Sequence, residues 1–428
     1  MDARDEPGHD AAQRATLSSR APIDAIHPAM ESLIARVVEL LGLAMAVAIV
    51  ARRLRLPYTV GLVLSGFALA LSRLDVGLAL THEVIFDLIL PPLLFEAALN
   101  LPWSYLRRDG PPILLFSTLG VLLSAALVTG GLHLGLGWPL QPAMAFGALI
   151  SATDPIAVIA LLRERGVKGR LALLIESESL ANDGAAAVLF GLATLAVPGG
   201  GLPPLGAAAA SLAWIAGGGI VVGLVTAGAA LLLVGRTEDH LIETAITAVA
   251  AYGSFIAAER CGASGVLATV TAGLVLGNLG VLAETPRVPA LTQQGREFVL
   301  AFWEFAAFLA NSFVFLLIGL ALARVGFPLT LRTAGVVALA LAGRAAAVYP
   351  LGAVFARTRW RVSAPELHFL WWGGLRGALA LALALTLPPD APYRGDILVG
   401  AFAVVAFSVL VQGLSAGLAL RRLGLQQE

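Results

Sequence analysis

Long, nearly uninterrupted apolar runs are the feature of this sequence that most limits its fold. Hydrophobic residues make up 58% of the chain and charged residues only 13%, and the charges cluster between the runs. A helix rises about 1.5 Å per residue, so about 20 apolar residues cross a bilayer core of about 30 Å. With a mean hydropathy of +0.86, the sequence predicts an all-α polytopic membrane protein.

By run length we expect about thirteen transmembrane helices. The polar residues 1–32 have no apolar core of the kind found in a signal peptide, so we predict a disordered tail there. Residues 33–420 form the transmembrane domain, and 421–428 a short cytoplasmic C-terminus. The predicted spans are 33–50, 57–72, 84–101, 112–133, 142–162, 171–197, 207–234, 241–258, 263–282, 298–323, 333–355, 366–387 and 397–419.

The distribution of Arg and Lys supports this division. With the C-terminus in the cytoplasm, seventeen of these residues lie on the cytoplasmic side and nine on the other, and two lie inside spans. Cytoplasmic loops are enriched in Arg and Lys. An odd number of spans then places the N-terminus outside. Because Lys+Arg and Asp+Glu both total 28, no net charge points to nucleic acid as a partner.

The spans divide as six, one and six, with the run 207–234 as the connector, which fits an inverted repeat. Corresponding spans of the two halves, 142–162 and 366–387, each carry an interruption. Pro155 disfavours helical geometry at Asp154, and glycines surround Arg376 in the second. We therefore expect two broken, crossing helices, because transporter sites lie near the midplane where helices stop early.

The sixth span carries a polar stripe. Helical spacing places Glu176, Ser179 and Asp183 on one face and Glu178 and Asn182 on the neighbouring one. A charged side chain at the bilayer centre costs about 2.5–3.5 kcal/mol on insertion scales, so these residues call for an explanation. The alternative is that the polar groups only tie helices together. For Ser179 or Asn182 alone, this structural role is as reasonable as a role in ion binding. The role of Glu176 is left open.

Carboxylate and hydroxyl oxygens converge in the predicted site. Asp154 and Thr153 lie at the break, and Asp183 and Ser179 lie on the sixth span. Hard monovalent cations such as sodium bind such oxygen sets. A low dielectric disfavours a charged carboxylate, so a proton competes with the cation for the same oxygens. If the site crosses the membrane only when it holds a cation or a proton, this competition produces exchange of one ion for the other.

Two arginines inside the membrane need anionic partners, since Arg keeps its proton. We predict that Arg344 forms a structural ion pair with Glu178, and that Arg376 compensates the carbonyl dipoles of the broken helices. Glu96 is a further acid in a span. It is either a member of the ligand shell or a packing partner, and the sequence does not separate these.

At these residues the chain resembles the monovalent cation:proton antiporter family, in its NhaP and sodium:proton exchanger branch. The matches run in the family's order over nearly all of the chain beyond the tail. They are SATDPIAV from Ser151, ESLANDGAAAVLF from Glu178, GRAAAVYP from Gly343, WGGLRGALAL from Trp372 and, more weakly, LPPLLFEAALNLP around Glu96.

The resemblance implies roles for single residues. Asp183 is the main ion-binding and proton-binding carboxylate, and Thr153, Asp154 and Ser179 complete the sodium coordination. Asn182 orients the site and, in place of a second Asp, favours electroneutral exchange of one cation for one proton. The implied assembly is a homodimer, whose core domain, near 84–197 and 298–419, moves to give alternating access. No cofactor is expected.

Other functions fit less well. A sodium-coupled solute symporter or a cation channel stays open as the alternative, although no polar or aromatic cluster demands an organic substrate. The Gly413–Gly417 pentapeptide fits GxSxG but lies in a membrane helix with no His after it, so an enzyme is not expected. The Ala-, Leu- and Arg-rich composition is typical of a bacterial plasma membrane protein.

Overall fold

The computed structural model describes residues 38–51, 53, 57–72, 81–167, 169–194, 204–282, 291–325 and 330–425. Over these ranges the chain is almost entirely helical, and strand pairing is limited to one isolated bridge. The all-α prediction is therefore confirmed. The tail predicted over 1–32 lies outside the described residues, as do 426–428 of the C-terminal segment.

Every predicted apolar run contains helix. In the part of the chain that the structure describes, four π-helical turns join or extend the helices: η1 (Val84–Ile89), η2 (Gly131–Gly135), η3 (Gly277–Val281) and η4 (Ser408–Gly413). The α-helices are Val38–Ala51, α3 (Tyr58–Leu71), α4 (Leu90–Leu99), α5 (Trp103–Ser117), α6 (Leu119–Gly130), α7 (Leu140–Ser151), α8 (Ile156–Glu164), α9 (Arg170–Thr194), α10 (Leu205–Val234), α11 (His240–Arg260), α12 (Gly265–Leu276), α13 (Gln293–Val325), α14 (Leu331–Val354), α15 (Ala364–Trp372), α16 (Ala378–Thr386), α17 (Arg394–Phe407) and α18 (Leu414–Arg422).

Six helical segments in the described ranges are long and apolar enough to cross a membrane unaided. Others, such as α7 and α16, are shorter because they are halves of interrupted helices or stop early. A count of thirteen spans stays a prediction. The membrane-spanning nature of the chain does not depend on that number, because the six long segments suffice for it.

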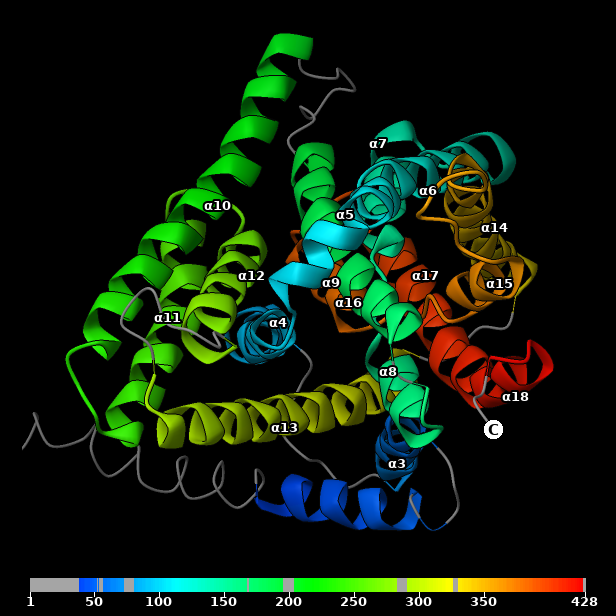
Figure 1. The fold of residues 1–428 in the computed structure, drawn as a ribbon. Coiled ribbons are helices and arrows are strands. Elements are labelled where there is room, and N and C mark those ends of the chain that lie inside the picture. The colour runs from blue at the N-terminus through cyan, green and yellow to red at the C-terminus, as the bar shows by residue number, and fades with distance from the viewer. Residues whose placement is uncertain are drawn as a thin grey trace, which may run out of the picture.

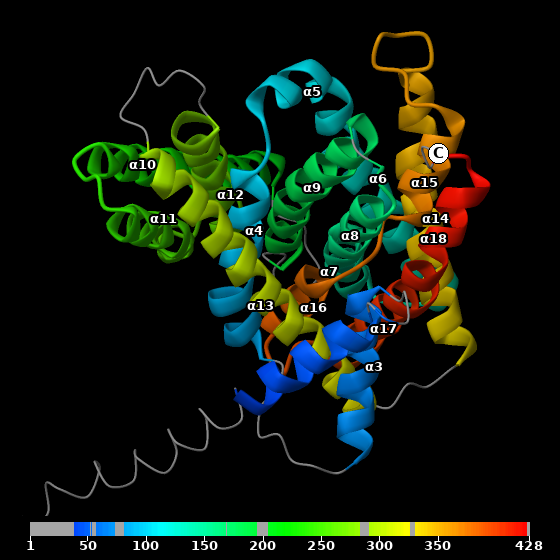
Figure 2. The same ribbon diagram turned by 60° about the horizontal axis from the view of Figure 1, so that its bottom comes forward.

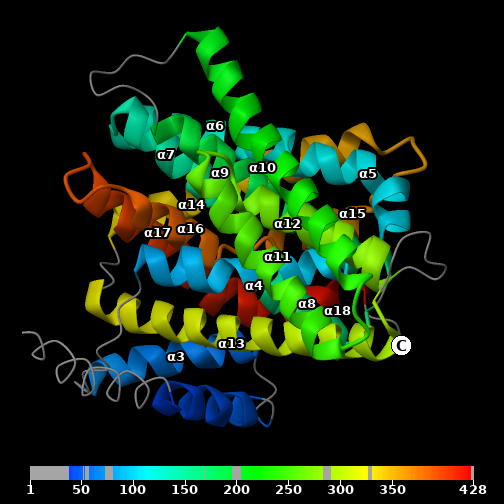
Figure 3. The same ribbon diagram turned by 90° about the vertical axis from the view of Figure 1, so that its left-hand side faces the viewer.

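The helices form two groups. In the first group α13 packs along α3 (Figure 3), and α12 packs against α4, α10 and α11. In the second group α6 packs against α7 and α14, α9 against α5 and α7, and α17 against α14 and α16. Figures 1 and 2 show α10–α12 on one side of α4 and the second group on the other. The border between the groups therefore runs beside α4 and α9.

Helix α5 begins earlier than the apolar run predicted from residue 112. Pro102 precedes it at the N-cap, and the helix bends at Asp109, whose backbone is not helical (φ −106°, ψ 15°). The bend comes two residues before Pro111, and Pro111 and Pro112 cannot donate helical hydrogen bonds. Arg108, which lies between the predicted spans 84–101 and 112–133, is therefore helical.

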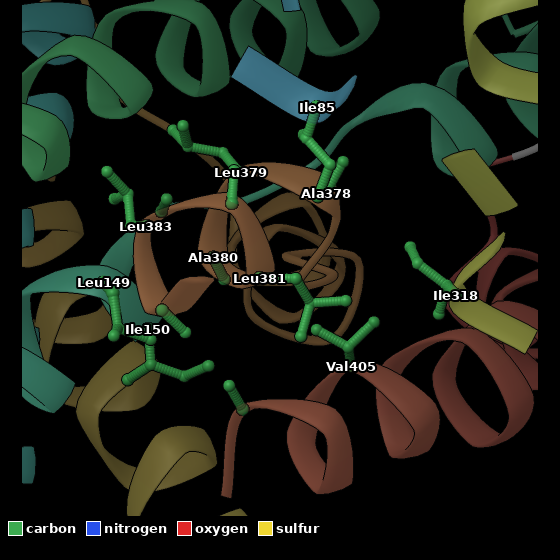
Figure 4. Packing of buried hydrophobic residues seen from close by; sticks show 14 of the residues in the cluster. Ile85, Leu149, Ile150, Ile318, Ala378, Leu379, Ala380, Leu381, Leu383 and Val405 are labelled. Carbon is green, nitrogen blue, oxygen red and sulfur yellow. The ribbon is translucent and has the colours of Figure 1, made fainter. Parts of the chain in front are cut away.

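Both predicted helix breaks are confirmed. The first helix stops at Ser151 and resumes at Ile156, and the second stops at Trp372 and resumes at Ala378. The two extended segments cross in antiparallel orientation. Helix α16 then lies in the centre of the largest apolar cluster, where residues of η1, α7, α13 and α17 surround it (Figure 4). An apolar helix buried on all sides fixes the position of the break at its N-terminus.

Candidate ion-binding site

The backbone groups freed at the first break find defined partners. The Asp154 amide donates to the Leu375 carbonyl oxygen (2.8 Å), and the Thr153 amide donates to Asn182 Oδ1 (3.1 Å). Asp154 Oδ1 accepts a hydrogen bond from the amide of Ile156 (3.0 Å). The Asp154 side chain thus caps α8, where the helix dipole favours an anion.

The second break approaches the same carboxylate. A Cβ atom on Gly377 would run into the side chain of Asp154, so only glycine fits there. Because Gly377 is the N-cap of α16, Asp154 lies at the N-termini of two half-helices at once. Sequence reasoning predicted the break from its glycines but not this close approach, for which the sequence gives no signal.

Asn182 connects the first break to α9. Its Nδ2 donates to Thr153 Oγ1 (2.6 Å) and to Glu178 Oε1 (2.9 Å), while its Oδ1 accepts from the Thr153 amide. The Ser179 hydroxyl donates to the Thr153 carbonyl oxygen. All four side chains are buried. The break is therefore held against α9 by a satisfied polar network, which specifies one arrangement.

Glu178 and Arg344 form a two-point ion pair. Arg344 Nη1 donates to Glu178 Oε1 (2.8 Å) and Nη2 to Oε2 (2.9 Å). The guanidinium also donates to the Leu370 carbonyl oxygen, from Nη2 at 3.1 Å and from Nε at 3.3 Å. Leu370 lies in the last turn of α15, so Arg344 also serves the negative end of a half-helix. Both charges are thus compensated without solvent.

Asp183 differs, because no described residue donates a hydrogen bond to its carboxylate or forms an ion pair with it. It lines a cavity of about 70 Å³ between α4, α9, α16 and the first break. That volume holds several waters or a partly hydrated ion. The polar residues that line it are Thr153, Asp154, Glu176, Ser179 and Asp183.

Glu96 and Arg376 lie away from this cavity. Among the described residues the cavity wall does not include Glu96, and Asn100 Nδ2 donates to Glu96 Oε1 (2.9 Å). Arg376 is buried and donates to the Gly374 carbonyl oxygen (3.3 Å), beside a separate small hollow that Arg344 also lines. Glu176 does line the cavity. Its seven-residue spacing from Asp183 was the signal that placed both on one helix face.

The donor set consists of oxygens alone. The carboxylates and the hydroxyls of Thr153 and Ser179 that line the cavity suit hard monovalent cations. The described residues contain no group of three or more His, Cys, Asp or Glu arranged to hold a metal ion. One exchangeable carboxylate in a cavity, next to fixed dipoles, can hold either a cation or a proton.

Comparison with known proteins finds relatives that are all named as sodium/proton exchangers or antiporters. The transmembrane sodium/hydrogen exchanger family matches residues 40–422. The Na(+)/H(+) antiporter ApNhaP of Aphanothece halophytica is 40% identical over 385 residues, covering 87% of this chain and 70% of the relative. The low-affinity Na(+)/H(+) antiporter NhaS1 of Synechocystis is 39% identical over 381 residues, with the same coverages. The sodium proton antiporter MjNhaP1 of Methanocaldococcus jannaschii shares the fold, with a TM-score of 0.69 at 22% identity over 92% of this chain and 99% of the neighbour.

Proposed function

This chain belongs to the sodium/hydrogen exchanger family, and from that premise we propose that it exchanges sodium ions for protons with Asp183 as the shared carboxylate. It is a transporter, as its named relatives are. The supporting observation is local. Asp183 faces a cavity and has no described hydrogen-bonding partner, so its charge needs a cation or a proton.

The neighbouring oxygens complete the coordination in this proposal. Ser179 lies one turn before Asp183 on the same wall of the cavity, and Thr153 and Asp154 line it from the break. Asp154 also caps α8, so part of its capacity to accept hydrogen bonds is already used. We assign the proton that is exchanged to Asp183 and assign Asp154 to electrostatic support of the cation.

The charges on α9 beside Asp183 favour electroneutral exchange. Glu178 and Arg344 neutralise each other, and Asn182 at the position before Asp183 carries no charge. With one titrating carboxylate, the loaded site has the same charge with a sodium ion as with a proton. One sodium ion then moves for each proton, and membrane voltage does not drive the cycle.

Alternating access would come from movement between the two helix groups. The cavity lies at their border, with α4 on one side and α9 and α16 on the other. We propose that the second group moves as the core domain and that the first mediates a homodimer. The core range predicted from the sequence also included α4 and α13, which pack with α3 and α10–α12. The division stays a prediction.

The proposed setting is a bacterial plasma membrane with the N-terminus outside and the C-terminus in the cytoplasm. The Arg and Lys distribution supports this orientation. Cys261 is itself exposed, so the test uses a Cys261→Ser background in which a cysteine introduced near the C-terminal end of α18 is probed with a membrane-impermeant thiol reagent. Labelling in intact cells would contradict the orientation, and labelling only after the cells are opened is the expected result.

Proton movement in reconstituted vesicles tests the function. Vesicles loaded at acidic pH receive sodium, lithium or potassium outside while a permeant ion clamps the voltage. We expect at least one of these cations to drive proton efflux at a rate that voltage does not change. If none does, exchange at this site is contradicted and solute-coupled transport becomes the leading function.

A further inference from the structure

The cavity wall contains a third carboxylate that the exchange cycle above does not use. Besides Asp154 and Asp183, the side chain of Glu176 lines the cavity. It is partly exposed, while its chain neighbours Ile175 and Ser177 are buried. Glu176 therefore faces the cavity and not the packed side of α9.

Glu176 lies between the exchange site and one end of the helix. Asp183 is in the middle of α9, which runs from Arg170 to Thr194. Seven residues span about two turns, so the two carboxylates lie about 10 Å apart along the helix axis. Glu176 is the one nearer the Arg170 end. An ion that approaches Asp183 from that end along the α9 wall passes Glu176 first.

The sides of the cavity formed by α4 and α16 give a cation little to bind. Helix α4 contributes Leu90, Leu93, Leu94 and Ala97, and α16 contributes apolar side chains. A cation that leaves water there loses hydration without replacement, which is costly. An acidic side chain at this place offsets part of that cost.

The adjacent end of α9 is positively charged. Arg108 and Arg170 share the single carboxylate of Asp109, each at 2.8 Å, which leaves one positive charge in excess. Two further arginines at this end are exposed. Arg165 lies five residues before Arg170 in the sequence, and the backbone carbonyl oxygen of Arg361 accepts a hydrogen bond from Arg170. Without an acid inside the cavity, this end would repel the cation that the protein transports.

We propose that Glu176 is an outer carboxylate of the transport path, which attracts the incoming monovalent cation and passes it to Asp183. The inference rests on the proposed exchange function. Glu176 holds the ion weakly and is not the group whose proton is exchanged. Its removal should therefore weaken the apparent affinity for the cation and leave the maximal rate in place.

Kinetics in reconstituted vesicles test this assignment. Sodium-driven proton efflux is measured in the intact protein and in Glu176→Gln, Glu176→Asp and Glu297→Gln. Glu297 is an exposed acid of α13 outside the cavity. One unit charge at about 10 Å in an effective dielectric of about 20 changes binding by roughly tenfold before screening.

We expect Glu176→Gln to raise the KM for sodium roughly three- to tenfold, with a maximal rate within about twofold of the intact protein. Glu176→Asp keeps the charge and should restore most of the affinity, and Glu297→Gln should change neither constant. Added choline chloride should narrow the gap between Glu176→Gln and the intact protein, because salt screens the charge.

Two results would overturn the assignment. One is an unchanged KM in Glu176→Gln, and the other is an equal loss of maximal rate in Glu176→Gln and Glu176→Asp, which indicates a packing role. Both presuppose that the intact protein exchanges sodium for protons. If the intact protein shows no exchange, the proposed function itself has failed, and that outcome is separate from these two.

Discussion

Helix α9 carries two carboxylates five residues apart whose surroundings differ. Glu178 faces Arg344 and Asn182 and accepts hydrogen bonds from both. Asp183 faces a cavity, and no described residue donates a hydrogen bond to it. The two acids have the same chemistry and lie at similar depth in the same helix. Only their partners distinguish a fixed charge from an exchangeable one.

The difference between Glu178 and Asp183 shows how one buried polar region can combine a fixed ion pair with a carboxylate that is available to bind ions. A buried carboxylate paired with Arg at two points has no reason to bind another cation, since its lone pairs are already used. A carboxylate without a protein partner must take one from solution. Asn182 joins both regions, because its amide bonds Glu178 on one side and Thr153 on the other.

The largest expected effect comes from removing the exchangeable charge. Asp183→Asn keeps the shape of the side chain but cannot exchange a proton, so sodium-driven efflux should fall at least a hundredfold. Folding should be preserved, because no described hydrogen bond is lost. The thermal unfolding midpoint in detergent should match or exceed that of the intact protein. Exchange at more than a tenth of the normal rate would place the shared carboxylate elsewhere.

Breaking the fixed pair should act on stability. Arg344→Gln leaves the buried Glu178 without its counter-charge, and the free energy of unfolding should drop by about 3–5 kcal/mol. The double variant Glu178→Gln with Arg344→Gln removes both charges and should recover much of that loss. The unfolding midpoint of each variant in one detergent measures this. A double variant no more stable than Arg344→Gln would show that the charge pair is not what stabilises this region.

The smallest effect in this series comes from the residue between the two regions. Asn182→Ala leaves the buried Thr153 amide and hydroxyl without their partner, at a cost of about 1–3 kcal/mol. Because the break loses part of its tie to α9 and keeps only the contact with Ser179, the KM for sodium should rise severalfold while exchange persists. The same vesicle assay checks this. A variant with normal affinity would mean that Asn182 does not position Thr153.

The sequence was sufficient to predict the all-helical class, the approximate positions of most helices and both breaks. Apolar run length placed the helices, and Pro155 and the glycines around Arg376 marked both interruptions because these residues disrupt helical hydrogen bonding. Residue spacing on α9 separated the Asp183 face from the Glu178 face, and the structure places Arg344 against Glu178. These features depend on neighbouring residues in the chain or on the balance of buried charges, and both can be read from a single sequence.

Features that depend on contacts across the fold could not be predicted. The approach of Gly377 to Asp154 and the bond from Arg344 to the Leu370 carbonyl oxygen join segments that are distant in sequence. The placement of Glu96 outside the cavity wall depends on how α4 is rotated about its axis. The early start of α5 escaped the hydropathy pattern because its first turns carry Arg108 and other polar residues.

Proton release on sodium binding tests the central claim most directly. Purified protein is placed in a weakly buffered detergent solution, sodium chloride is added, and the pH is followed, with choline chloride as the control salt. If Asp183 holds either ion, the protonated protein should release about one proton per chain, and Asp183→Asn should release none. Sodium binding to the intact protein without proton release, or equal release from Asp183→Asn, would contradict the shared carboxylate.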